Sequence, residues 1–191
     1  MKKRLVVFTG AGVSADSGLS TFRDADGLWA NYRIEDVCTP EALKRNRVLV
    51  VEFYNKRRKE LLSVEPNPAH YAIAELEKYF DVEVVTQNVD NLHERAGSSR
   101  VTHLHGELMK LRSERNQELI VPIEGWEQTL EERAEDGALL RPHIVFFGVR
   151  TAGISTTDMV FLTTTSMRCD KTILCPILCH TPHHKTSAPR V

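Results

Sequence analysis

Short apolar runs alternate with amphipathic segments along the first 150 residues of this 191-residue chain. Residues 5–8 form a continuous apolar run, which is typical of a parallel strand covered on both faces. Apolar positions within 68–80 recur at helical spacing and predict a helix. The remaining predicted elements are strands at 81–86, 101–104 and 144–147 and helices at 40–45 and 52–63. This alternation favours an α/β fold with a parallel, Rossmann-like sheet.

Two inserts interrupt the alternation. The first is helical and charge-rich, and the second shows no clear strand but an acidic segment, 126–138, that predicts a helix. We expect the two inserts to build a small helical module within a single domain, 1–191. The predicted boundaries are 1–30, 67–112 and 142–167 for the core, 31–66 and 113–141 for the module, and 168–191 for an atypical tail.

Composition argues against nucleic-acid-binding, membrane-spanning and disulfide-rich classes of protein. Hydrophobic residues make up 41% of the chain, which is enough for a core, and the net charge of −1 does not favour nucleic acid as a partner. No apolar run approaches the ~20 residues that span a bilayer, and the start does not predict a signal peptide. The four cysteines do not form a disulfide framework. We therefore expect a cytoplasmic protein without a membrane or nucleic-acid partner.

A glycine-rich turn follows the first strand. Gly10, Gly12 and Ala15 match G-x-G-x-x-A, in which glycines let the backbone approach a pyrophosphate at a helix N-terminus. A dehydrogenase would next show a strand that ends in an acidic residue about 20 residues further on. Glu35 and Asp36 have that distance, but the residues before them do not predict a strand. A tight strand–helix turn without a ligand is the alternative.

Two further polar stretches follow predicted strands. TQNVDNLHERAG, residues 86–97, places Asn88 and Asp90 at the carboxyl edge, where open α/β sheets bind ligands. VTHLHGEL, residues 101–108, brings His105 to the same edge, directly before a glycine. A lone histidine is usually structural, but at this edge it is a candidate general base.

Together these stretches resemble the sirtuins, a family of NAD-dependent protein deacylases. GAGVSADSGLSTFR is similar to the family's GAGxSxxSGIPxFR, TQNVDNLH to TQNxDxLH, and the HG of LHGEL to the catalytic histidine motif. RPHIVFFG, residues 141–148, resembles the strand that pairs with the substrate backbone. The resemblance runs in order from residue 5 to residue 148.

The resemblance implies a mechanism in which NAD is consumed. The acyl-lysine amide oxygen attacks the nicotinamide ribose as nicotinamide leaves, and His105 then acts as the base on a ribose hydroxyl. The acyl group passes to the ribose, which gives free lysine, nicotinamide and O-acyl-ADP-ribose. Asn88 and Asp90 are the other implied catalytic residues, and they hold the nicotinamide end and its ribose.

The resemblance also implies two sets of binding residues. Those for NAD are Gly10, Ala11, Gly12, Ser14, Ala15, Phe22, Arg23, Trp29, Gln87, Asn88, Val89 and Asp90. Those for the substrate are Tyr54, Arg57, Val145, Phe146, Phe147 and Gly148. The implied partners are acyl-lysine proteins or peptides.

One departure from the common motif points to the acyl group. GLSTFRDADGLW carries Ser-Thr where Pro-Asp is common and resembles the class III bacterial branch, which has a Tyr-x-x-Arg pair in its acyl pocket. Tyr54 and Arg57 match that pair, and at i, i+3 they share a helix face. An Arg–carboxylate contact favours succinyl- and malonyl-lysine over acetyl-lysine. The alternative is a solvated basic face, because three more basic residues lie beside them: Lys56, Arg58 and Lys59.

A second departure concerns zinc. Most relatives carry two CxxC pairs that form a structural Cys₄ site. Here Ser113 and Asn116 stand where the first pair would be, and no cysteine occurs between Cys38 and Cys169. We therefore predict no zinc in the module. A small apolar core is expected in its place, from Leu119, Ile120, Val121, Ile123 and Trp126.

The last part of the chain departs further. Val149 stands where the family has glutamate, 158–162 could be the next strand, and 163–167 resembles a GTSM loop with Thr164 in place of glycine. The resemblance is lost after Met167, so we expect the C-terminal strands to be incomplete or altered. Three explanations stay open. They are an altered reading frame or truncation, a divergent end with its own function, and a metal site at Cys175, Cys179, His180, His183 and His184.

The sequence thus supports one main hypothesis and two alternatives. The main hypothesis is an NAD-dependent lysine deacylase that prefers succinyl and malonyl groups and also removes acetyl groups. The first alternative is a truncated or frame-altered remnant that binds nucleotide or acyl-lysine peptide without turnover. The second is a dehydrogenase-like Rossmann protein, which the missing acidic residue after a second strand disfavours.

Overall fold

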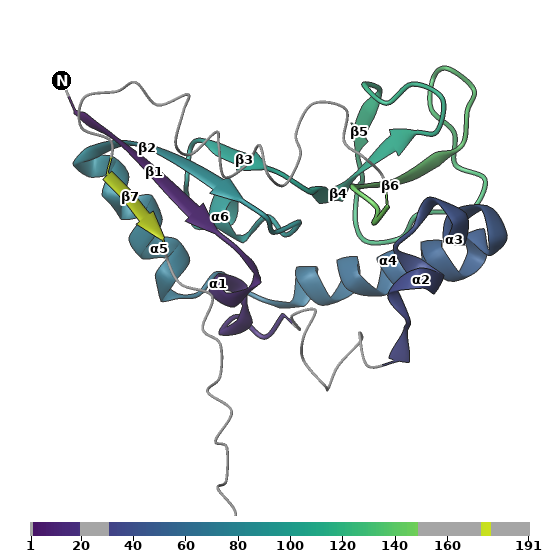
Figure 1. The fold of residues 1–191 in the computed structure, drawn as a ribbon, viewed down its shortest axis with the longest axis horizontal. Helices are drawn as coiled ribbons and strands as arrows, with labels where there is room; N and C mark the ends of the chain where they lie inside the picture. Colours follow the sequence, from purple (N-terminus) through teal and green to yellow (C-terminus); the bar gives the residue numbers. More distant parts are fainter. Residues whose placement is uncertain (1, 20–30, 149–172, 177–191) are drawn as a thin grey trace, which may run out of the picture.

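The computed structural model describes residues 2–19, 31–148 and 173–176. Among these residues, four parallel strands form a sheet in the order β3-β2-β1-β7, and three antiparallel strands form a second sheet in the order β5-β4-β6 (Figure 1). The parallel sheet consists of β1 (Lys3–Thr9), β2 (Phe80–Thr86), β3 (Val101–His103) and β7 (Ile173–Pro176). The α/β fold with a Rossmann-like parallel sheet is confirmed.

The centre of the parallel sheet is formed by β1 and β2. Their register runs from Lys3 opposite Phe80 to Thr9 opposite Thr86, so both strands end at the same level. The segments that follow Thr9 and Thr86 therefore emerge side by side at one edge of the sheet. This edge is where open α/β sheets bind their ligands.

Helix α5 (Pro68–Glu75) packs against the sheet through Ile73, in a buried cluster with residues of β1 and β2. Its start follows from the sequence, because the Asn67 side chain accepts a hydrogen bond from the Ala69 N–H and Pro68 stands at the first helical position. The helix predicted for 68–80 is shorter than expected. It continues as the 3₁₀ turn η2 (Leu76–Lys78), and Phe80 already belongs to β2.

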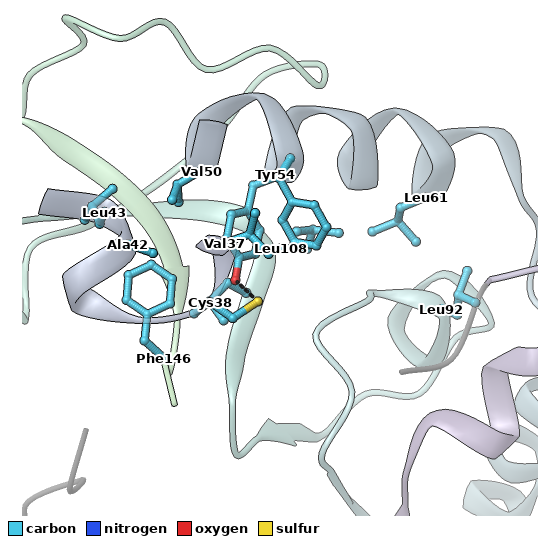
Figure 2. Packing of buried hydrophobic residues seen from close by; sticks show 12 residues of the cluster. Val37, Cys38, Ala42, Leu43, Val50, Tyr54, Leu61, Leu92, Leu108 and Phe146 are labelled. Atoms are coloured by element: carbon cyan, nitrogen blue, oxygen red, sulfur yellow. Dashed lines mark hydrogen bonds between the residues drawn. The ribbon is translucent and has the colours of Figure 1, made fainter. Parts of the chain in front are cut away.

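The long helix α4 (Arg47–Ser63) spans the distance between the two sheets, and α2 (Ile34–Val37) and α3 (Pro40–Arg45) lie at its end near the second sheet (Figure 1). α4 begins five residues before the predicted start at 52, because the Asn46 side chain caps it by accepting from the Leu49 N–H. Its buried side chains form a cluster with residues of α2, β4 and β6 (Figure 2). The short α6 (Leu92–Arg95) contributes Leu92 to the same cluster.

The second sheet corrects three predictions. It consists of β4 (Gly106–Ser113), β5 (Ile120–Pro122) and β6 (Leu140–Ile144), so the second insert does contain strand structure. Residues 126–138 form turns and irregular structure with an isolated bridge from Arg133 to Leu139 rather than a helix, and Gly125 and Gly137 adopt positive φ angles near the two ends. The strand predicted at 144–147 is also wrong: β6 ends at Ile144.

The insert has its own small core. Leu111, Ala134 and Leu140 are buried, and Leu119, Val121 and Ile123 pack against them, as predicted. Ile120 and Trp126, which were expected in this core, are exposed at 39% and 36%. The division of the domain into a Rossmann core and a module made from 31–66 and 113–141 stays a prediction.

A buried polar cluster fastens the insert to α4. Arg58 is completely buried and donates to the backbone carbonyls of Trp126 (2.8 Å) and Leu108 (3.4 Å) and to the Asn55 side chain (2.5 Å). The Asn55 side chain also pairs with the backbone of Gln128, accepting from its N–H at 2.9 Å and donating to its carbonyl at 3.0 Å. The sequence offered a solvated basic face as an alternative, and for Arg58 that alternative is wrong.

Burial lowers the pKa of Arg58 to about 10, although the negative charge of Glu132 opposes the shift. The guanidinium therefore stays charged at neutral pH, and hydrogen bonds to carbonyl and amide oxygens stabilise it.

None of the helices in the described ranges has the length and apolar character needed to cross a membrane.

We predict that Arg58→Met destabilises the fold by roughly 3 kcal/mol, because it leaves the buried carbonyls of Trp126 and Leu108 without a donor. Urea unfolding checks this value. The matched control is Lys59→Met, which removes an exposed charge that lies over the Trp126 ring and should cost about 1 kcal/mol or less. Equal losses in the two variants would contradict the structural role of Arg58.

Candidate active site

The candidate site lies where β1 and β2 end. After Thr9 the chain passes through Gly10, whose backbone is extended (φ −145°, ψ −172°), and enters α1 (Ala11–Ala15). No side chain caps the start of α1, and Ala11 and Gly12 are exposed. The first N–H groups of the turn are therefore available to an acceptor from outside, as a pyrophosphate-binding turn requires.

Ser14 is the centre of a buried polar network beneath this turn. Its hydroxyl donates to Oδ2 of Asp90 at 3.0 Å and accepts from the side-chain amide of Asn88 at 3.0 Å. Oδ1 of Asp90 accepts from the Leu92 N–H at 3.2 Å, which fixes the carboxylate from its other side. The structure thus brings together the glycine turn and the Asn-Val-Asp stretch that the sequence singled out separately.

A neutral histidine, His70, supports Ser14. Its Nδ1 accepts from the Asn67 N–H at 3.3 Å, so its Nε2–H points at the Ser14 hydroxyl, 3.4 Å away. Burial lowers the pKa of His70, opposed by the charge of Asp90. The Asn67 side chain also donates to the carbonyl of Val13 at 2.7 Å and so holds α1 in place.

A second buried histidine, His93, links the two strand ends. Thr9 donates its hydroxyl proton to Thr86 at 2.8 Å, so His93 Nε2–H donates to the Thr9 hydroxyl at 3.0 Å. Burial lowers the pKa of His93 to about 4, with the neighbouring His70 and His103 adding to the shift and Glu94 opposing it. Sequence analysis missed His70 and His93. The LH of TQNVDNLH was the available signal for His93, whereas His70 carried none.

The predicted base, His105, is exposed at the same edge. Its Nδ1 lies 3.0 Å from the backbone carbonyl of Gln87, and because a carbonyl only accepts, Nδ1 carries the proton. In the neutral ring this leaves the lone pair on Nε2, the nitrogen that a general base needs. The next residue must be glycine: Gly106 has φ +84°, and an added Cβ would lie 2.1 Å from the carbonyl oxygen of His143.

The proposed acyl pocket lies at α4. Tyr54 is buried, and a hydrogen bond of 3.4 Å joins its hydroxyl to Sγ of Cys38 (Figure 2). Burial raises the pKa of Tyr54 well above its usual value and also raises that of Cys38, while the charge of Arg57 lowers both. Arg57 is half-buried and close enough to act on both groups. Tyr54 and Arg57 lie one turn apart on α4, and their role in an acyl pocket stays a prediction.

The predicted substrate-binding segment begins directly after β6. The Val145 N–H donates to the carbonyl of His105 at 3.0 Å, and the Phe147 N–H donates to the carbonyl of Cys38 at 2.9 Å. Phe146 is buried against Tyr54, whereas Phe147 is 53% exposed and Gly148 is exposed. The segment thus lies between the candidate base and Cys38, the hydrogen-bonding partner of Tyr54.

Several predicted features lie outside the described residues. These are Phe22, Arg23 and Trp29, the departure at Val149, the strand at 158–162 and the GTSM-like loop at 163–167. Of the Cys/His cluster in the tail, only Cys175 lies within a described element, because the backbone of 173–176 forms β7 beside β1. In the described ranges no group of histidine, cysteine and acidic residues is placed to hold a metal ion.

Comparison with known proteins separates the sirtuin hypotheses from the dehydrogenase-like alternative. The model of the Sir2 family matches residues 10–174. The chain belongs to the Sir2 family. This confirms the resemblance and excludes the dehydrogenase-like alternative. The match extends past Met167, after which no family motif was recognised in the sequence, and it ends within β7.

Three curated relatives of this Sir2 chain come from bacteria. An NAD-dependent protein deacylase of Aggregatibacter actinomycetemcomitans is 54% identical over 148 residues, which are 78% of this chain and 71% of the relative. One from Bacteroides thetaiotaomicron is 56% identical, over 81% of this chain and 68% of the relative. Against a deacylase of Helicobacter pylori the identity is 53%, and the match spans 63% of that relative's length.

Solved structures agree with the family. A Sir2 homologue in complex with ADP-ribose has a TM-score of 0.74 and 37% identity, over 92% of this chain and 70% of that chain. A Sir2 homologue in complex with NAD has a TM-score of 0.69 and 42% identity, over 78% of this chain and 59% of that one.

We predict that stability falls as the pH drops from about 6.5 towards 4, because unfolding exposes His93 to protonation that its buried site resists. The pKa of His93 is about 4 in the fold against ~6.5 in the unfolded chain. The free energy of unfolding therefore keeps its full value above pH ~6.5 and falls by up to ~3 kcal/mol as the pH drops below it. His93→Gln keeps a donor for Thr9 but cannot titrate. Urea unfolding at several pH values should give a shallower acid loss for this variant, and an unchanged slope would contradict the assignment.

Proposed function

We propose that this chain is an NAD-dependent protein-lysine deacylase that prefers succinyl- and malonyl-lysine over acetyl-lysine. The NAD dependence and the deacylase class agree with the names of its curated relatives. One observation carries the proposal. His105 is exposed with its proton held on Nδ1 by Gln87, next to a buried network of Ser14, Asn88 and Asp90.

The described residues fit NAD. The uncapped turn after Gly10, exposed at Ala11 and Gly12, offers N–H groups to a pyrophosphate. Asn88 and Asp90 add an amide and a carboxylate at the neighbouring strand end. Ser14 holds both of these side chains in place, so the amide and the carboxylate are already oriented when a ligand binds. NAD, when bound, supplies nicotinamide as the leaving group and the ribose that accepts the acyl group. Phe22, Arg23 and Trp29 stay predicted members of this site.

His105 has the geometry of a general base. Its Nδ1–H is fixed by the Gln87 carbonyl, so the ring is oriented and its Nε2 lone pair is available to take a proton from a hydroxyl. When Nε2 becomes protonated, the same carbonyl stabilises the positive ring through the Nδ1–H. This is the orienting role that a third group has in catalytic triads.

The acyl preference rests on Tyr54 and Arg57. The raised pKa keeps the Tyr54 hydroxyl protonated, so it can exchange its 3.4 Å contact with Cys38 for a bond to a carboxylate. The Arg57 guanidinium is near enough to lower the pKa of Tyr54. A terminal carboxylate on the acyl group would meet a cation and a neutral donor together. An acetyl group has no charge to offer. Residues 145–148, exposed at Phe147, are the proposed contact for the peptide backbone.

We predict that purified protein releases nicotinamide from NAD in the presence of succinyl-lysine peptide and that His105→Ala lowers the rate by about 10³-fold. The sharper variant is His105→Asn, whose amide can still donate to the Gln87 carbonyl but has no basic nitrogen. It should be as inactive as the alanine variant. Substantial turnover in His105→Asn would show that His105 acts structurally.

Absence of turnover in the folded wild-type chain would favour the alternative in which the protein binds nucleotide or acyl-lysine peptide without reaction. Nicotinamide release that does not need the peptide would contradict the coupling of acyl transfer to NAD cleavage.

We predict that Arg57→Met lowers kcat/KM for a succinyl-lysine peptide by about 10²-fold, the loss expected for a charge-assisted contact, and leaves the acetyl-lysine value nearly unchanged. Tyr54→Phe should act in the same direction. The matched control is Lys56→Met, which removes a neighbouring charge that bonds Tyr32 instead. Equal losses on both peptides would contradict the proposed pocket.

A further inference from the structure

Residues 86–89 are bonded along their whole length to the segment that carries the base. The carbonyls of Thr86 and Val89 accept from the backbone N–H groups of Leu104 (2.9 Å) and Leu108 (2.7 Å). The carbonyls between them, of Gln87 and Asn88, accept from histidine side chains: His105 at 3.0 Å and His103 at 2.8 Å. The loop that presents Asn88 and Asp90 is thus held by two backbone groups and two imidazoles.

The two imidazoles differ in their second nitrogen. Nε2 of His105 bonds none of the described residues and is the nitrogen proposed as the base. Nε2 of His103, in contrast, lies 2.7 Å from Oε1 of Glu94. Both partners of His103 are acceptors, a carbonyl and a carboxylate, so satisfying both requires a proton on each nitrogen. A neutral His103 has one N–H and holds only one of them.

The surroundings of His103 favour the cation. Burial lowers the pKa of His103, but the hydrogen bonds to Glu94 and to the Asn88 carbonyl, together with the negative charges of Glu94 and Glu107, raise it above its ordinary value. His93, the other titratable group beside it, is neutral and adds no repulsion at neutral pH. The His103 side chain is only 6% exposed, which limits screening by water.

We propose that His103, as a cation paired with Glu94, is a positioning residue for the reaction: it holds the Asn88 carbonyl and so fixes the 86–90 loop against His105. This rests on the proposed deacylase function. A shift in this loop moves three groups at once, namely the Asn88 amide, the Asp90 carboxylate and the carbonyl that orients His105. His103 therefore acts on the rate through its neighbours and touches no substrate.

The inference predicts an alkaline limb in the pH profile of kcat. As the pH rises through the raised pKa of His103, the ring loses one of its two protons and releases either the Asn88 carbonyl or Glu94. Glu94→Gln removes the charge that favours the cation, so this limb should move to lower pH. A purely structural role of the side chain would not move it.

Two amide variants separate the two contacts. His103→Gln places an amide near the Nε2 position and keeps the contact to Glu94, so kcat should fall about tenfold with little change in KM. His103→Asn places the amide near Nδ1 and keeps the bond to the Asn88 carbonyl. It should retain kcat within about threefold and lose the alkaline limb, because it does not titrate. Thr102→Ala, at an exposed position on the same strand, is the control and should match wild type.

An alkaline limb that persists unchanged in His103→Asn would overturn the proposal, as would equal kcat values for the Asn and Gln variants. A second measurement tests the proposal without requiring enzymatic turnover. In a ¹⁵N NMR titration the His103 ring of the wild type should carry protons on both nitrogens above the ordinary pKa of histidine, and Glu94→Gln should lower that pKa. An ordinary pKa that does not respond to Glu94→Gln would overturn the proposal even if the wild type proved inactive.

Discussion

The site depends on the fixed position of residues 86–90 between two neighbours. On one side their backbone carbonyls are held by the segment 103–108, and on the other the side chains of Asn88 and Asp90 are held by Ser14. Both contacts become possible because β1 and β2 end at the same level, with Thr9 opposite Thr86. The sheet register thus determines which polar groups meet, and the hydrogen bonds then fix how they are oriented.

Four histidines lie close to this loop, and their surroundings separate their roles. His70 and His93 are buried, have lowered pKa values and act as neutral hydrogen-bonding groups. His103 is bonded to two acceptors, which only the doubly protonated ring satisfies together, and its pKa is raised. His105 bonds a single carbonyl and presents its second nitrogen outwards. Active sites commonly give chemically similar side chains different pKa values through their surroundings. These different pKa values separate the acid, the base and the structural groups.

Much of this could be predicted from the sequence, and the failures have physical causes. The parallel sheet, the glycine turn and the positions of Asn88, Asp90 and His105 followed from apolar runs that end in polar residues. The second sheet did not, because β5 and β6 have only 3 and 5 residues and their connections include positive-φ glycines such as Gly125 and Gly137. The sequence did not indicate that Arg58 is buried, because it lies among other basic residues and its carbonyl partners, Leu108 and Trp126, are far away along the chain. The roles of His70 and His103 likewise depend on contacts that no local pattern records.

The central claim is that the acyl group leaves lysine for the ribose of NAD, with His105 as the base. Mass spectrometry of the products formed from NAD and a succinyl-lysine peptide tests it most directly. The account predicts free lysine peptide, nicotinamide and a succinylated ADP-ribose in equal amounts. Free succinate without cleavage of NAD, or ADP-ribose released with the peptide still acylated, would contradict it.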